Sequence, residues 1–190
     1  MPYLILRQDQ NPNSWIALPN DSLEFWKLID GKAPASSNEP LRIELAEESK
    51  EPTDFFDFPY WIVSNTMKMA LIEFGVNNID YFPVTLFKFG NETEHSGYYL
   101  CSIAESLSCV DQEKSHFKVR LPGKQGSLRN FQIDERIVDD RLLFRLKENP
   151  QLILISVRLK EHLQNCGLKG IYYQETDKYD GNPVSSFWES

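Results

Sequence analysis

The chain has 190 residues, of which 41% are hydrophobic and 13% aromatic, so it can form one globular domain with a core of its own. The 28 acidic and 20 basic residues give a formal net charge of −8. This charge argues against general binding to nucleic acids or anionic membranes, because their phosphate groups would be repelled. It suits a basic protein partner, although ordinary solubility of an acidic protein also explains it.

The cysteine pattern and the N-terminus indicate where the protein resides. Cys101, Cys109 and Cys166 follow no zinc or redox spacing, so we expect reduced thiols in or near the core. The N-terminus lacks the basic segment and the long apolar stretch of a signal peptide. No part of the sequence approaches the roughly 18 consecutive apolar residues of a membrane helix. We therefore expect a cytoplasmic protein.

The N-terminal part, residues 1–40, is expected to form a small appendage that packs on the main domain. Residues 2–7 and 15–18 have the composition of strands, and residues 21–31 that of a short capped helix. Residues 33–40, rich in alanine, serine and proline, are the best linker candidate. Because so short a segment cannot bury a core alone, the appendage is a subdomain at most.

The main domain, expected over residues 41–190, begins with an acidic stretch that becomes aromatic. This composition suits a protein interface, because aromatic side chains supply buried anchors and carboxylates attract the lysines and arginines of a partner. We take Glu47, Glu48, Asp54 and Asp57 as candidate partner-binding residues that steer a basic partner. The alternative is that the aromatic side chains pack in the core and the acids form a solvated rim.

Two segments share the pattern of an apolar run, a serine, a helix, a glycine and a strand. Ser64 is expected to cap a helix that ends at Gly75, where a glycine can adopt the left-handed conformation. Ser156 is expected to cap a second helix that ends at Gly167, and the strand after it begins at Gly170.

Between these helices we expect strands joined by turns, over residues 79–89, 98–104, 117–121, 128–133 and 142–146. Pro83 should turn part of the first strand into an edge or a bend. Many strands and about three short helices, not in strict alternation, predict an α+β fold with a mixed or antiparallel sheet.

No group of residues has the spacing of a known catalytic or metal site. The histidines are scattered, with His95 expected in a polar loop and His162 at the edge of the core. Residues 123–127 lack the spacing of a phosphate loop, and residues 139–141 are expected to form a turn with a local ion pair. We therefore predict no metal, no cofactor and no enzymatic activity.

A series of short motifs, taken together, resembles a known family. The motifs are Pro52-Thr53-Asp54-Phe55, Trp61-Ile62-Val63-Ser64, Tyr81-Phe82-Pro83-Val84-Thr85-Leu86, Tyr98-Tyr99-Leu100, Val110-Asp111-Gln112-Glu113-Lys114-Ser115, Leu143-Phe144-Arg145-Leu146 and Gly167-Leu168-Lys169-Gly170-Ile171-Tyr172. Their order resembles the eleventh family of bacterial immunity proteins from polymorphic toxin systems, formerly a domain of unknown function. The resemblance covers roughly residues 52–173.

The resemblance implies a non-catalytic protein that binds a cognate toxin and occludes it, without identifying the toxin. It also implies structural roles for the matched residues Asp54, Asp111, Ser115, Phe144 and Arg145. Arg145 is expected to pair with Asp111 or Asp54. Two alternatives from other classes are a cryptic hydrolase or transferase, and a scaffold or regulatory module without a toxin partner.

Overall fold

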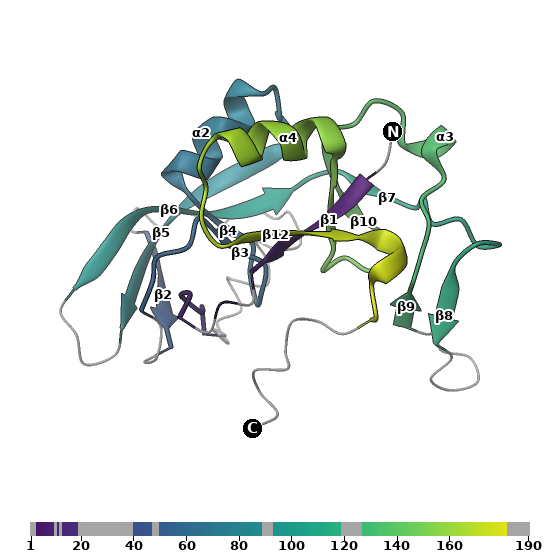
Figure 1. The fold of residues 1–190 in the computed structure, drawn as a ribbon. Helices are drawn as coiled ribbons and strands as arrows, with labels where there is room; N and C mark the ends of the chain where they lie inside the picture. The colour runs from purple at the N-terminus through teal and green to yellow at the C-terminus, as the bar shows by residue number, and fades with distance from the viewer. Residues whose placement is uncertain are drawn as a thin grey trace. The chain divides into compact units, whose positions relative to one another are not determined.

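The computed structural model describes residues 3–9, 11, 13–18, 40–46, 50–88, 93–118 and 127–181. The chain divides into two compact units, and Figure 1 labels most of their helices and strands. The first unit consists of Met1–Leu6, Glu105–Glu161 and Tyr173–Ser190, and the second of Arg7–Ala104 and His162–Tyr172. The boundary expected at residue 40 adjoins residues outside the described part, so the division into an appendage and a main domain stays a prediction.

The first unit is organised around a five-stranded sheet in the order β12-β1-β11-β10-β7. Its strands are β1 (Tyr3–Gln8), β7 (Ser106–Leu107), β10 (Leu143–Leu146), β11 (Ile153–Ser156) and β12 (Ile171–Glu175). Strands β1 and β10 run antiparallel to β11, whereas β7 runs parallel to β10, so the sheet is mixed. A separate hairpin joins β8 (His116–Lys118) to β9 (Ser127–Arg129).

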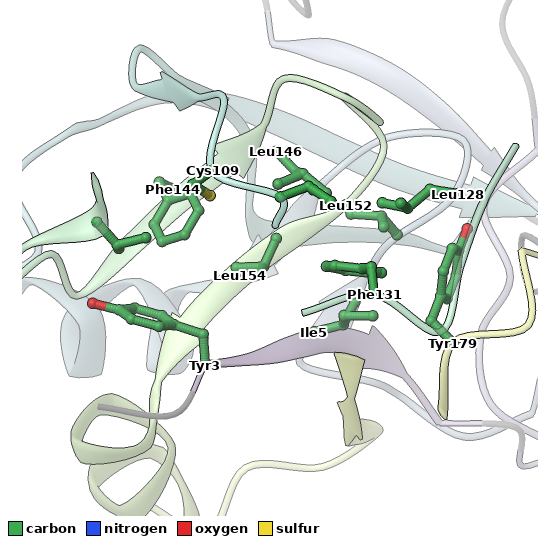
Figure 2. Close-up of a cluster of buried hydrophobic side chains, with 12 residues drawn as sticks. Tyr3, Ile5, Cys109, Leu128, Phe131, Phe144, Leu146, Leu152, Leu154 and Tyr179 are labelled. Atoms are coloured by element: carbon green, nitrogen blue, oxygen red, sulfur yellow. The ribbon is translucent and has the colours of Figure 1, made fainter. Parts of the chain in front are cut away.

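A cluster of buried side chains forms the core of the first unit. Figure 2 shows Tyr3 and Phe144 at one end of this cluster and Phe131 and Tyr179 at the other. The first two rings meet edge to face at 5.4 Å between centroids, and the second two at 5.9 Å. Aromatic pairs favour this geometry, because the positive ring edge faces the negative ring face.

The second unit contains another mixed five-stranded sheet, in the order β2-β5-β6-β4-β3. Its strands are β2 (Leu41–Leu45), β3 (Phe55–Phe56), β4 (Ile62–Ser64), β5 (Ile79–Lys88) and β6 (Glu94–Ile103). Strand β2 runs parallel to β5, and the other neighbours are antiparallel. One face of this sheet packs into a core with Trp15, Ile43 and Leu86.

The α-helices of the described residues are α2 (Asn65–Glu73), α3 (Glu135–Val138) and α4 (Val157–Asn165), and a 3-10 helix, η1, covers Thr176–Lys178. Helix α2 packs against β4 and β6 of the second unit. Two mixed sheets with three short helices confirm the predicted α+β class.

The structure bears on two expectations from the middle of the sequence. Phe55, Phe56, Tyr60 and Trp61 are buried, so these aromatic side chains pack in the core, as in the alternative to the interface interpretation, and are not surface anchors. The solvated acidic rim of that alternative does not include Asp57, whose side chain is 8% exposed. Strand β2 pairs with residues 84–88 of β5, whereas Pro83 pairs with Tyr99 of β6 and lies beyond the pairing with β2. Among the described strands, the part of β5 that contains Pro83 is therefore at an edge, as predicted.

Three local predictions were wrong. His95 lies in β6 and not in a loop, because the β5–β6 pairing continues beyond the apolar residues, and its ring lies 4.6 Å from that of Trp15. Residues 15–18 form no strand, since the chain here makes only isolated bridges on either side of Trp15. Arg141 follows a turn as expected, but its ion pair is made with Glu105, which is distant in sequence.

Several other predictions fall on residues outside the described part. These are the helix at 21–31, most of the linker at 33–40, the glutamates Glu47 and Glu48, and most of the turn at 123–127.

Candidate functional site

Two of the four candidate partner-binding residues, Asp54 and Asp57, lie in the described segment that leads to α2. Both make structural contacts within the second unit. Upstream of them, Glu51 is exposed and its Oε2 accepts a hydrogen bond from Asn11 Nδ2 at 3.2 Å.

Asp54 connects the start of α2 to the turn that precedes β12. Its carboxylate accepts hydrogen bonds from the Ser64 hydroxyl and, at 2.7 Å, from the backbone N–H of Lys169. Its backbone N–H donates to the Lys169 carbonyl and its carbonyl accepts from the Ser64 N–H, both at 2.9 Å. Two hydrogen bonds of the side chain and two of the backbone therefore connect Asp54 to two other chain segments.

Ser64 links Asp54 to the helix itself. Its Oγ accepts a hydrogen bond from the Met67 N–H at 3.2 Å, which satisfies one of the free donors in the first turn of α2. Ser156 does the same for α4, since its Oγ accepts from the Leu159 N–H at 3.3 Å. Gly75, with φ of +97°, follows α2 in the left-handed region.

Gly170 is required at the same junction because the chain approaches Thr53 closely. Gly170 has φ of +73°, and a Cβ atom there would lie 1.8 Å from Thr53 Oγ1. The Thr53 hydroxyl donates to the Phe55 carbonyl at 3.1 Å, so it is held in place. Gly167 also has a positive φ, +67°, but a Cβ atom there would meet nothing within 4 Å.

Asp57 forms a buried ion pair with Arg7. The Asp57 Oδ2 lies 2.7 Å from Arg7 Nε, and each side chain is 8% exposed. Burial raises the pKa of the Asp57 carboxyl above its usual value, while the charge and hydrogen bond of Arg7 act in the opposite direction. The pair ties Arg7 to the segment before α2 within the second unit, and Arg7 compensates the charge of Asp57 locally.

The C-terminal end of α2 packs against His162. The Nε2 atom of His162 lies 3.0 Å from the Ala70 carbonyl oxygen, and the imidazole ring stacks on Phe74 with 4.6 Å between centroids. His162 is half-buried, at the edge of the core as expected from the sequence.

In the first unit, Asp111 and Ser115 organise a turn. Asp111 Oδ2 lies 3.1 Å from Lys114 Nζ, and the hydrogen bond from this lysine lowers the pKa of the Asp111 carboxyl. Ser115 Oγ accepts from the Gln132 N–H at 3.0 Å. These contacts fix the chain between β7 and β8.

The other two matched residues of this unit lie on β10. Phe144 is fully buried, and the backbone N–H of Arg145 donates to the Glu105 carbonyl at 2.9 Å. The expected pairing of Arg145 with Asp111 or Asp54 stays a prediction.

The buried thiols are poor nucleophiles. Burial raises the pKa of Cys101 far above its usual value, and burial with the nearby Glu148 and Asp134 raises that of Cys109 to about 12. Both thiols are therefore protonated at neutral pH, and the thiolate is the reactive form. Within the described ranges, no group of three or more His, Cys, Asp or Glu residues could hold a metal ion. None of the described helices is long and apolar enough to cross a membrane.

The contacts that sequence reasoning missed join distant segments. Arg7 is the single charged residue of the predicted strand at residues 2–7, which is otherwise apolar. A charge in such a strand is a sign that it is buried and needs a partner. The partner itself, Asp57, is 50 residues away. The close approach of Thr53 and Gly170 had no sign in the sequence beyond the glycine itself.

Comparison with known proteins identifies a family. The model described as Immunity protein family (Imm11) matches residues 4–178. Comparison with curated proteins finds no match. The family match begins in β1 and ends in the 3-10 helix, so it extends beyond the motifs at both ends.

Proposed function

Because the chain belongs to the Imm11 immunity protein family, we propose that it binds a cognate bacterial toxin and neutralises it by occlusion. The family match over residues 4–178 carries this proposal. In this role the protein acts in the cytoplasm and forms a stable complex, and it needs no catalytic step.

The chemistry of the described residues supports binding over catalysis. The thiols of Cys101 and Cys109 are held in the protonated form, and Asp57 is paired with Arg7 in the interior. These groups serve packing and structure, whereas a catalytic group needs access to a substrate and a pKa near the working pH.

The acidic character of the chain supports a basic toxin surface. A formal net charge of −8 accelerates the encounter with a positively charged partner. Within the proposal, Glu47, Glu48, Asp54 and Asp57 are the candidate steering residues. Asp54 and Asp57 also hold the structure together, so a charge change there would alter folding as well as association.

Steering is therefore tested at Glu47 and Glu48. We expect the double variant Glu47→Lys/Glu48→Lys to bind the toxin with a slower association rate and a weaker dependence on salt. A matched control is Glu113→Lys/Glu135→Lys, which makes the same change in net charge at two exposed positions of the first unit. If both double variants associate at the wild-type rate, the acidic segment has no part in steering.

Co-expression tests the proposed function itself. The protein encoded by the adjacent upstream gene is expressed in a sensitive host with and without this chain, and complexes are then isolated by pull-down. Rescue with a stable complex supports immunity by binding. Rescue without a complex indicates an enzyme that reverses the damage. If the upstream protein is not toxic and no complex forms, the proposal is contradicted for that partner.

A further inference from the structure

Helix α2 buries one side in the second unit and exposes the other. Met67, Ala70 and Leu71 are buried. On the outer side, Met69 is 44% exposed and Ile72 is 45% exposed. Residues three apart in a helix are neighbours on its surface, so these two side chains form one apolar area.

The charge at the end of this outer side is negative. Glu73, the last residue of α2, is exposed, and the last turn of α2 contains no basic residue. The C-terminus of a helix carries a partial negative charge of its own, so it adds to the charge of Glu73. His162 approaches the Ala70 carbonyl, and its ring stacks on Phe74.

The lysine of α2 is directed toward aromatic rings. Lys68 Nζ lies 3.6 Å from the centroid of the Tyr99 ring and 5.2 Å from that of Tyr81. A cation over the face of an aromatic ring is attracted by it, which holds the ammonium group over the sheet. The α2 patch, defined as Met69, Ile72 and Glu73, is thus apolar with a negative end.

We propose that the α2 patch is a docking surface for the cognate toxin, an inference that rests on the proposed function. Charge complementarity indicates which toxin surface fits the α2 patch. This surface presents an apolar side chain and, ~5 Å or one helical turn away, a lysine or arginine. The apolar side chain covers Met69 and Ile72, and the cation pairs with Glu73 and the negative helix end. An adaptable methionine suits such a contact, because it fits irregular partner surfaces.

The first unit supplies a matched control. Ile137 of α3 is 48% exposed, close to the value for Ile72, and it also lies on a helix. Its neighbour Arg136 forms an ion pair with Asp134 at 2.7 Å. Ile72→Glu and Ile137→Glu introduce the same group at similarly exposed helical positions.

The experiment measures the affinity of the full chain for a catalytically inactive form of the protein encoded by the adjacent upstream gene. We expect Met69→Glu and Ile72→Glu each to weaken binding by about thirtyfold, the effect of losing one hot-spot residue. Glu73→Lys should weaken it by about tenfold and reduce its dependence on salt. Ile137→Glu should change it by less than about threefold, and all four variants should keep the wild-type thermal midpoint, since surface changes rarely alter stability.

Each result separates this inference from the proposed function. If the wild-type chain does not bind the probe, the proposed function fails for this partner and the inference fails with it. If the wild type binds and the α2 variants bind no worse than Ile137→Glu, only the inference is overturned. If the wild type is a dimer in solution that Ile72→Glu converts to a monomer, the patch is a contact between two copies and the inference is also overturned.

Discussion

Removal of Arg7 should destabilise the second unit strongly, because it leaves the Asp57 carboxylate buried without its cation. Both side chains are 8% exposed and their charged atoms are 2.7 Å apart. Breaking a buried ion pair by removing one partner costs about 3–5 kcal/mol. For Arg7→Met, which keeps much of the side-chain volume, we expect a loss in this range. At the usual scaling for a chain of this size, this corresponds to a fall of about 10 °C in the thermal midpoint.

The loss should depend on pH. Burial already raises the pKa of Asp57, and Arg7 opposes that rise. Without Arg7 the folded-state pKa rises further, so the folded variant binds a proton more tightly than the unfolded chain does. The variant should therefore be closest to the wild type at pH values below the unfolded pKa of aspartate, about 3.9. The deficit should grow as the pH rises through the folded pKa.

Urea unfolding followed by tryptophan fluorescence measures this loss, because Trp15 and Trp61 are buried in the second unit. The control is the double variant Arg7→Met/Asp57→Leu, which removes both charges and should recover most of the stability. A loss below about 1 kcal/mol for Arg7→Met, in the range of an exposed ion pair, would refute the reasoning.

Three further predictions concern packing and reactivity. Gly170→Ala should cost about 2 kcal/mol or more in urea unfolding, because its Cβ would collide with Thr53 Oγ1 at 1.8 Å, while Gly167→Ala, with open space, should cost less. Ser64→Ala should lower stability by about 1–2 kcal/mol through loss of the α2 cap, as measured by the same method. In labelling with a thiol reagent, Cys166, which is half-buried, should react in the native protein, and the buried Cys101 should react only after unfolding. Equal labelling rates for the two would contradict the burial of Cys101.

Local patterns predicted α2 and α4 well, whereas the short helix α3 was not expected from the sequence. Ser64 with Gly75, and Ser156 with Gly167, mark the ends of α2 and α4, because caps depend on residues within a few positions of the helix end. Apolar runs bounded by turn residues likewise placed most strands.

The contacts that hold the candidate site together could not be predicted in the same way. Arg7 and Asp57 are 50 residues apart, and Thr53 and Gly170 are 117 apart, so their pairing depends on sheet order. The sequence placed Asp57 among surface acids because its neighbours are acidic, whereas the structure shows its side chain buried. The negative end of the outer side of α2 becomes evident only once the contacts of Lys68 and His162 are known.

The stoichiometry of protection tests the central claim most directly. The toxic activity of the protein encoded by the adjacent upstream gene is measured in vitro against increasing amounts of this chain. A protein that neutralises by occlusion should abolish the toxic activity at a fixed molar ratio of this chain to the toxin. A complex of the two proteins should be isolable at that ratio. Full protection at amounts far below the toxin concentration would show turnover by an enzyme and would contradict the account.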